Sequence, residues 1–369
     1  MDIPKAEAEK TMRGSRQAFT EQLEENRKLI RTRIPDERLR EHQLTLGTRT
    51  KTKVSLLYME DLAYEGIVKE VYKKLDGIAR DEVLDSGVAE QLTKGDTRSP
   101  FPQYQATERP DRTAQALLEG RVAVLLDHSP EALLLPVTLN TLFQASDDYY
   151  RHFWIVSFLR GIRWLAAFLA AFLPGLYVAA TGFHTQILPT NLILVMAEAR
   201  KGVPFPGIVE VLLMELSFEL IREAGIRMPG AIGDTIGIVG GLIVGQAAVS
   251  ANLISPMTVV IVAFTALGSF SVPNEEVSEA LRLVKYLILI LAGIWGIFGV
   301  VLGGWFLLVH LAGLKSFEIP YLYPFTGGEM NQGEDLKDSL IRSPMNRMWK
   351  RPVFARREQR VRMGKSGKE

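Results

Sequence analysis

A block of about 150 strongly apolar residues constrains this chain more than any other feature, because most charged residues lie before residue 150 or after residue 315. Segregation of this kind is typical of a membrane domain with flanking soluble parts. The near-zero formal net charge of +1 averages over these parts and conceals it. The sequence therefore predicts an α/β soluble N-terminal domain (residues 1–150), a polytopic α-helical membrane domain (151–315) and a basic tail (316–369).

The apolar block contains several separate runs. Residues 164–182 are long enough for a tilted span, although Pro174 and Gly175 interrupt the run. Arg160 and Arg163 precede it and predict a cytoplasmic N-terminal side. The further runs are 186–196, 206–225, 230–255, 257–270 and 284–314, the last expected to form one long helix.

The end of the chain is basic, since residues 342–369 contain ten Lys or Arg and two Glu. A composition of this kind is typical of a cytoplasmic segment that faces anionic lipid. The N-terminus lacks the pattern of a signal peptide, so it is also expected in the cytoplasm. Two cytoplasmic termini require an even number of crossings, and the runs allow about four to six spans.

The soluble part alternates strand and helix patterns. Residues 53–62 are typical of a strand, and residues 63–78 of an amphipathic helix. Residues 121–127 and 132–139 flank the turn-like "HSPE" and predict a hairpin. Residues 15–34 are expected to form a further helix. The alternation predicts a small α/β domain.

One connector in this domain has an unusual composition, "FPQYQATERPD" at residues 101–111. It is either an extended connector whose Arg109 is paired locally, or a docking element toward the membrane part or a neighbouring subunit. The candidate docking residues are Phe101, Pro102, Gln103, Thr107, Glu108, Arg109, Pro110 and Asp111.

Several kinds of chemistry have no support in the sequence. The absence of cysteine excludes disulfides, thiolate metal sites and cysteine nucleophiles. His128, His152 and His184 show no ligand spacing, and "GKSG" near the end lacks the strand that precedes a phosphate loop. We therefore expect no enzyme activity, no cofactor, no metal site and no nucleic-acid partner.

The stretch "VEVLLMELSFELIREAG" (209–225) places carboxylates in an apolar helix. At about 100° per residue, Glu215, Glu219, Arg222 and Glu223 share roughly a third of the helix circumference, whereas Glu210 lies off this stripe. The helix could lie at the interface, although interfacial helices usually carry basic residues there. The carboxylates could also be paired internally, with Arg222 satisfying Glu219, or could line a cation path.

The next run carries regularly spaced glycines, Gly233, Gly237, Gly241 and Gly245. A glycine every four residues forms a ridge without side chains, against which another helix can pack closely. Asp234, Gln246 and Asn252 lie in the same region, and polar groups inside a membrane normally face protein or water. They are further candidates for an ion path.

Taken together, these stretches resemble the A subunit of the GerA-type spore germinant receptors, including the related SpoVAF-like proteins. The resemblance covers nearly the whole chain. The matching stretches are "RGSRQAFTEQLEENRKLIRTRI", "GTRTKTKVSLLYMED", "FPQYQATERPD", "LLEGRVAVLLDHSPEALLLP", "DDYY", "LPGLYVA", "VPFPGIVEVLLMELSFELIREAGIRMP" and "GIVGGLIVGQAAVSANLISP".

The resemblance implies a multi-pass protein of the spore inner membrane that works with a transporter-like B subunit and a lipoprotein C subunit. It also implies assembly into a homo-oligomeric cation channel that opens at the start of germination, and no catalytic site. The family usually has a further soluble subdomain before "RGSRQAF", whereas this chain begins close to that motif. The choice between a receptor A subunit and a SpoVAF-like accessory component therefore stays open.

Two other functions compete with the channel. A monomeric secondary transporter also uses broken helices, but the apolar block shows no inverted repeat and too few runs for two halves. A membrane scaffold without conduction would have its carboxylates fully paired between helices.

Overall fold

The structure is a computed structural model that describes residues 9, 14–227, 231–331 and 333–362. The side chains of residues 231–239, 242, 328, 329 and 334 lie outside this description. The chain divides into two compact units. The α/β unit comprises residues 1–162 with 310–369, and the helical unit comprises residues 163–309.

The α/β unit is built on a five-stranded sheet in the order β1-β2-β4-β5-β3, in which every neighbouring pair is antiparallel. The predicted strand within residues 53–62 and the hairpin around "HSPE" are confirmed as β2 and as the pair β4–β5. The strands are β1 Leu39–Leu46, β2 Thr52–Met59, β3 Gln105–Thr107, β4 Val122–Leu126 and β5 Ala132–Leu135.

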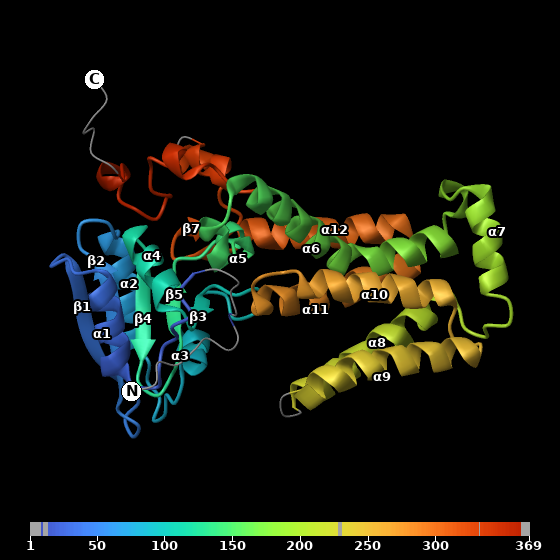
Figure 1. The fold of residues 1–369 in the computed structure, drawn as a ribbon, viewed down its shortest axis with the longest axis horizontal. Coiled ribbons are helices and arrows are strands. Elements are labelled where there is room, and N and C mark those ends of the chain that lie inside the picture. Colours follow the sequence, from blue (N-terminus) through green and yellow to red (C-terminus); the bar gives the residue numbers. More distant parts are fainter. Residues whose placement is uncertain (1–8, 10–13, 228–230, 332, 363–369) are drawn as a thin grey trace. The chain divides into compact units, whose positions relative to one another are not determined.

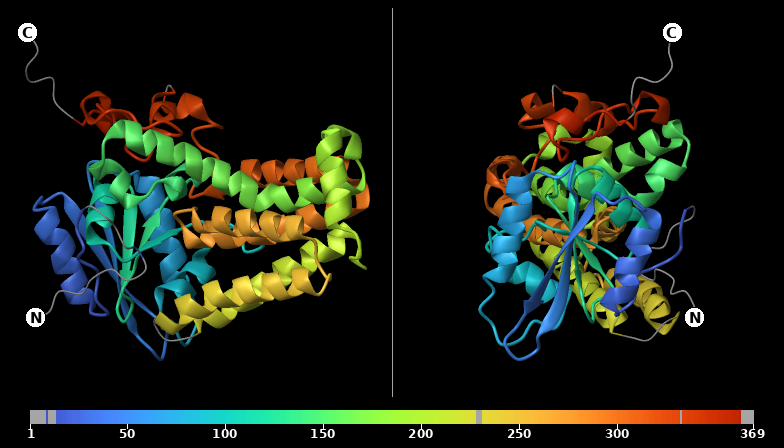
Figure 2. Two further views of the ribbon diagram at one scale, coloured as in Figure 1. Left: turned by 45° about the vertical axis from the view of Figure 1, so that its right-hand side comes forward. Right: turned by 90° about the vertical axis from the view of Figure 1, so that its left-hand side faces the viewer.

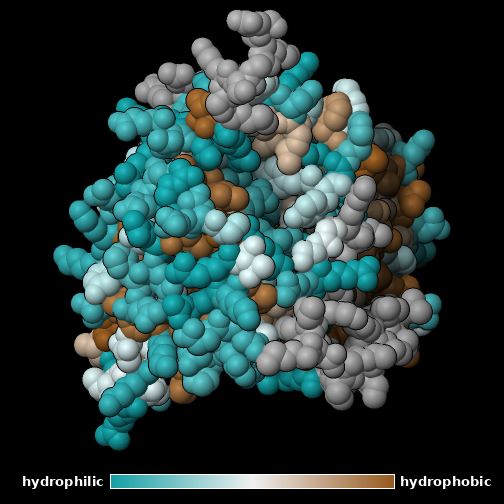
Figure 3. Space-filling view, turned by 60° about the vertical axis from the view of Figure 1, so that its left-hand side comes forward, coloured by the Kyte–Doolittle hydropathy of each residue, from teal (hydrophilic) through white to brown (hydrophobic). Residues whose placement is uncertain are grey.

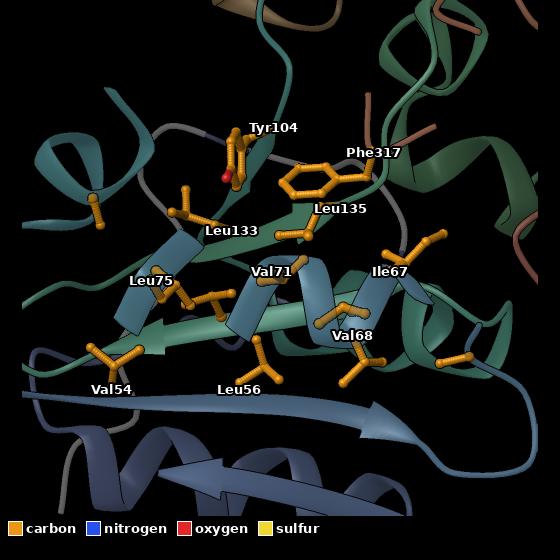
Figure 4. Packing of buried hydrophobic residues seen from close by; sticks show 14 of the residues in the cluster. Val54, Leu56, Ile67, Val68, Val71, Leu75, Tyr104, Leu133, Leu135 and Phe317 are labelled. Carbon is orange, nitrogen blue, oxygen red and sulfur yellow. The ribbon is translucent and has the colours of Figure 1, made fainter. Parts of the chain in front are cut away.

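Helices cover both faces of this sheet (Figure 1; Figure 2, right). In β2, Leu57 and Met59 pack with α1 and α4, whereas Val54 and Leu56 pack with α2 and α3 (Figure 4). This alternation follows from the two-residue period of a strand. The helices are α1 Leu23–Arg33, α2 Glu65–Asp76, α3 Ser86–Thr93, α4 Pro110–Leu118 and α5 Leu139–Phe143, followed by the 3-10 helix η1 Ser146–Tyr150.

The C-terminal part of the chain contributes to the same core. Phe317 lies edge-on to Tyr104, with ring centroids 5.6 Å apart (Figure 4), and Val353 and Phe354 are buried in the same cluster. The range 316–369 was expected to be a separate tail, whereas its described residues pack within the α/β unit. The segment includes β6 Lys315–Ser316, β7 Ile319–Pro320, η3 Gly328–Asn331, η4 Glu334–Asp338, η5 Met345–Arg347 and η6 Arg357–Gln359.

The surface of the α/β unit that faces the viewer in Figure 3 is mostly hydrophilic, with hydrophobic residues in small groups. A surface of this kind is typical of a domain in water.

The helical unit is formed by seven helices among the described residues, of which α6 and α12 extend across its boundaries. Pro174 lies inside α6 without ending it. In the described part of the chain, only α6 is long and apolar enough to cross a membrane, while α7, α10 and α12 are apolar but shorter. The helices are α6 Phe153–Gly182, α7 Thr190–Ala199, α8 Gly207–Ile226, α9 Ala231–Ser250, α10 Pro256–Phe270, α11 Glu275–Trp295 and α12 Ile297–Gly313, with the 3-10 helix η2 Thr185–Ile187.

The prediction of one long helix over residues 284–314 is wrong, because the chain reverses between α11 and α12. The reversal occurs at Gly296, whose φ of 60° is unfavourable for other residues. Gly299 and Gly303 then lie against α11, where an added Cβ would meet the backbone of Leu291 and the side chain of Ile288. An apolar run alone does not reveal such a hairpin.

The helical unit exposes many large apolar side chains and buries a few charged ones. Among the described residues of this unit, the buried charged residues are Glu210, Glu215 and Lys285, whereas its other described charged side chains are partly or fully exposed. Large exposed apolar side chains beside buried charges are unusual for a domain in water. The exposed apolar residues include Leu213, Leu216, Leu220, Phe264, Leu267, Leu283, Leu287, Ile290, Ile294, Val301 and Trp305.

Candidate functional site

The candidate site is a group of ion pairs between α8 and α11, named here the α8–α11 charge cluster: Glu215, Glu219, Arg282 and Lys285. Sequence spacing explains the geometry, since the two carboxylates are four residues apart and the two basic residues are three apart. Glu215 pairs with Lys285 and Glu219 with Arg282, so the order of partners is reversed along the second helix. The two helices therefore pack antiparallel to each other.

The inner pair of the α8–α11 charge cluster is buried. Lys285 Nζ lies 2.5 Å from Glu215 Oε2, and the two side chains are only 3% and 2% exposed. Lys285 also lies 3.6 Å from Glu219 Oε1. The second oxygen of Glu215, Oε1, has no hydrogen-bond partner among the described residues. A buried carboxylate depends strongly on its single cation, because removal of that cation leaves an uncompensated charge.

The outer pair is partly open to the surroundings. Arg282 Nη1 donates to Glu219 Oε2 at 3.1 Å, and the same guanidinium lies 3.2 Å from Glu279 on its own helix. The side chain of Glu219 is 24% exposed. Glu219 is thus the one member of the cluster whose carboxylate is both paired with α11 and accessible.

The other two residues of the predicted stripe lie outside the cluster. Arg222 lies 3.8 Å from Glu275 and 5.3 Å from the ring of Phe270. Glu223 is 60% exposed and pairs with Arg227 of the same helix at 2.6 Å. One of the alternatives left open by the sequence paired Glu219 with Arg222, whereas the ion pairs formed by Glu219 involve Arg282 and Lys285. A lone lysine in the apolar run "LVKYLILIL" was the signal for this partner.

Glu210, which lies off the stripe, forms a second buried polar site. Arg200 Nη2 donates to its Oε1 at 2.9 Å. The N–H of Ser255 and the hydroxyl of Thr258 donate to its Oε2 at 2.9 and 3.2 Å. Ser255 is the N-cap of α10, so the carboxylate stabilises the start of that helix. Helical counting missed this residue, because its partners come from separate elements.

The predicted glycine ridge is only partly described. Gly245 is buried, and an added Cβ there would lie 3.4 Å from Val259 of α10. An added Cβ on Gly241 would meet open space. The surroundings of Gly233 and Gly237 lie outside the described residues, so packing along the whole ridge stays a prediction.

Gln246 and Asn252, the polar candidates near the ridge whose side chains are described, are not members of the charge cluster. Gln246 is exposed on α9, and Asn252 is exposed after that helix with a φ of 55°. The side chain of Asp234 lies outside the described residues. Their role in an ion path stays a prediction.

The candidate docking stretch forms part of the α/β core, and Arg109 is paired locally. Its guanidinium is 1% exposed and donates to both oxygens of Asp111, at 2.6 and 3.0 Å. Tyr150 also donates to Asp111. Burial raises the pKa of Asp111, but the hydrogen bonds from Arg109 outweigh this effect and leave the pKa below its ordinary value.

Most other side chains of this stretch are also buried within the unit. The side-chain oxygen of Gln103 accepts hydrogen bonds from the N–H groups of Gly95 and Asp96. Its backbone carbonyl accepts a hydrogen bond from the hydroxyl of Ser316. Thr107 donates to Glu9. A docking role stays a prediction. The buried residues are Phe101, Pro102, Gln103, Thr107 and Pro110, whereas Glu108 is half-buried.

Comparison with known proteins gives consistent results over nearly the whole chain. The family described as "Bacillus/Clostridium GerA spore germination protein" matches residues 1–354. Spore germination protein KA of Bacillus subtilis is 41% identical over 96% of this chain and 65% of its own length. Spore germination protein B1 of the same organism is 40% identical over 98% of this chain and 74% of its own length.

Two further proteins are similar. An uncharacterized membrane protein of Bacillus subtilis, YfkQ, is 42% identical over 93% of this chain and 66% of its own length. The chain thus spans about two thirds of the length of these relatives. The crystal structure of the N-terminal domain of the A subunit of the Bacillus megaterium germinant receptor GerK3 matches with 41% identity and a TM-score of 0.27, covering 32% of this chain and 94% of that one.

Proposed function

The chain belongs to the GerA family of spore germination proteins, and we propose a function for it on that premise. We propose that it is a membrane-embedded A-type subunit that conducts cations as a homo-oligomer when germination begins. The proposed location is the spore inner membrane, with both termini in the cytoplasm. The proposed partners are a transporter-like B subunit and a lipoprotein C subunit.

The distribution of polarity in the helical unit supports a polytopic membrane domain. The apolar side chains of α8, α10, α11 and α12 are exposed, while Glu215 and Lys285 are buried as an ion pair. Charged residues inside a membrane are normally paired or face a water-filled path. We propose an even number of membrane crossings. Helix α6 would provide one of them, and other helices of the unit would provide the rest.

The α8–α11 charge cluster is the observation that carries the proposal of conduction. Acidic side chains along a pore attract cations. In the described chain, Glu219 and Glu223 are accessible, whereas Glu215 is held by Lys285. We therefore assign the described arrangement to a closed state. Opening of the channel would then separate α8 from α11 and release the carboxylates.

The same ion pairs favour a second function, a non-conducting membrane scaffold. Both carboxylates of the charge cluster already have basic partners on the neighbouring helix, as the scaffold requires. The two functions differ in one measurable property, since a scaffold conducts no ions in any state.

Ion flux through the purified protein in proteoliposomes tests the proposal. We expect Glu219→Gln and Glu223→Gln to lower cation flux and cation-over-anion selectivity, because each removes an accessible negative charge. Glu198→Gln, an exposed carboxylate on α7, is the matched control and should leave both unchanged. Unchanged flux in the two α8 variants would refute the ion path, and no flux from the wild type with its partners would favour the scaffold.

Cross-linking in native membranes tests the assembly. A discrete oligomer supports the channel, and capture of a transporter-like subunit supports a receptor A subunit over an accessory component. A monomer with substrate-dependent uptake would instead indicate a secondary transporter.

A further inference from the structure

The α/β unit contains a cavity of about 430 Å³ that the proposed function does not use. One wall comes from the segment around α5 and η1, including Thr138, Asn140 and Tyr149. The other wall comes from the C-terminal segment, including Tyr323 and Trp349. Aromatic and polar side chains thus share the lining, and the volume is in the range of small-molecule sites.

The carboxylates of this cavity are already engaged by the surrounding protein. Glu119 lies 3.0 Å from Arg362. Asp335 accepts the hydroxyl of Tyr323 and the N–H of Val353. These contacts use the acidic groups to hold the walls together, so they do not make the cavity a site for cations.

The charges that line the cavity favour an anion. Glu119, Asp335 and Asp338 supply three carboxylates, and Asp338 is also paired with Arg160 outside the lining. Among the described residues of the lining, four basic residues exceed the three carboxylates by one. They are Lys337, Arg347, Lys350 and Arg362.

A second cavity of about 40 Å³ adjoins the first and contains a buried arginine. The two cavities share Glu119, Thr141, Gln144 and Tyr149 in their linings. Arg121 lines the smaller one and is 4% exposed. Its Nε donates to the carbonyl of Pro136 and its Nη1 to Gln105, while Nη2 has no hydrogen-bond partner among the described residues. Burial lowers the pKa of Arg121 to about 9.

Asn140 supplies an acceptor that also lacks a partner. Its side chain lines the larger cavity, its residue is 8% exposed, and its Oδ1 has no hydrogen-bond partner among the described residues. Buried polar atoms normally have a partner, and an unsatisfied one costs about 1–3 kcal/mol. The smaller cavity thus has a cationic donor, Arg121, in its lining. The larger cavity has a separate acceptor, Asn140.

We propose that the two cavities form one binding site for a small soluble organic anion that also carries a hydroxyl or amine donor. A carboxylate or phosphate would accept from Arg121 in the smaller cavity, and the donor would reach Asn140 in the larger one. Both unpartnered atoms are buried, so binding requires Arg121 and Asn140 to turn toward their cavities.

Binding to the purified full chain in detergent tests this site, with calorimetry and ligand-induced thermal shifts as readouts. The probes are malate and glycerol 3-phosphate, which have an anionic group and a hydroxyl, and succinate, which lacks the hydroxyl. We expect saturable binding of malate or glycerol 3-phosphate, and binding of malate about tenfold tighter than that of succinate because only malate can donate to Asn140. No saturable binding of either hydroxyl-bearing probe would overturn the proposal.

Two variants separate binding from folding. Asn140→Leu removes an unsatisfied acceptor, so the thermal stability without ligand should be unchanged or higher, while the preference for malate over succinate should disappear. Asn346→Leu, at an exposed position of the same C-terminal segment outside the lining, should preserve that preference. A retained preference in Asn140→Leu would overturn the assigned donor contact.

A lipid arm of the experiment identifies the source of the anion. Phosphatidylglycerol and phosphatidylcholine nanodiscs are compared as competitors of glycerol 3-phosphate. We expect neither lipid to displace it. Displacement by phosphatidylglycerol would overturn the assignment to a soluble molecule and assign the site to a lipid headgroup.

Discussion

Lys285→Met tests the inner pair of the α8–α11 charge cluster most directly. Methionine keeps much of the volume of lysine but removes the ammonium group that lies 2.5 Å from Glu215. Because both side chains are almost completely buried, the carboxylate would be left without compensation. Breaking a buried pair in this way costs about 3–5 kcal/mol, so we expect a loss of this size in the free energy of unfolding.

The assay is reversible unfolding of the purified protein in a mixed detergent system, combined with a double-mutant cycle. Glu215→Leu together with Lys285→Met replaces the pair by apolar groups and should recover most of the lost stability, to within about 1–2 kcal/mol of the wild type. Arg227→Met breaks the exposed pair with Glu223 and is the matched control. That control should cost at most about 1 kcal/mol.

Two outcomes would refute this reasoning. The first is a cost for Lys285→Met that equals the cost for Arg227→Met, which would mean that the pair is solvated. The second is a double variant that is as unstable as the sum of the single variants, which would mean that the two residues do not interact.

Three further predictions concern other parts of the chain. Glu210→Ala should cost about 3 kcal/mol in thermal unfolding, since it breaks the ion pair with Arg200 and removes the acceptor at the start of α10; a cost below about 1 kcal/mol would contradict the buried site. Gly299→Ala should destabilise the protein by about 1–3 kcal/mol because its Cβ meets the backbone of α11, whereas Gly313→Ala on the same helix meets nothing and should be neutral. Because the folded pKa of Asp111 is lowered, its pair with Arg109 stabilises the fold above the ordinary carboxyl pKa of about 4 and loses this effect as pH falls through the folded pKa; Asp111→Asn should flatten that acid dependence in hydrogen exchange of the α/β unit.

The sequence allowed the sheet to be predicted where strands are apolar on both faces. β4 and β5 are buried along their whole length, and β2 alternates between two helix layers. β1 was missed because "LREHQLTL" is largely polar and forms an edge of the sheet. The three residues of β3 are too few for any periodic pattern. Local patterns therefore predicted the centre of the sheet and left its edges unassigned.

The candidate site was predictable on one helix only. Helical counting placed Glu215 and Glu219 on one face of α8, and the structure has both on the face toward α11. Their partners Arg282 and Lys285 lie more than 60 residues later in the chain. The nearby Arg222 was the only candidate partner that local spacing could offer. The correct basic partner can be identified only when the packing of α8 against α11 is known. The spacing of residues within α8 carries no information about that packing.

The energetics of the inner pair bear on the choice between channel and scaffold. A buried ion pair is expensive to separate but adds little stability over an apolar pair of the same shape, because desolvation offsets the attraction. A scaffold gains little from such a pair, whereas a gate gains a closed state that opens only when binding energy separates the charges. If the proposed gate is correct, Glu215→Leu with Lys285→Met should retain most of the stability and should raise the basal cation flux in proteoliposomes. A double variant that stays as stable as the wild type and never conducts, in a preparation whose wild type conducts with its partners, would show that the pair does not control the path.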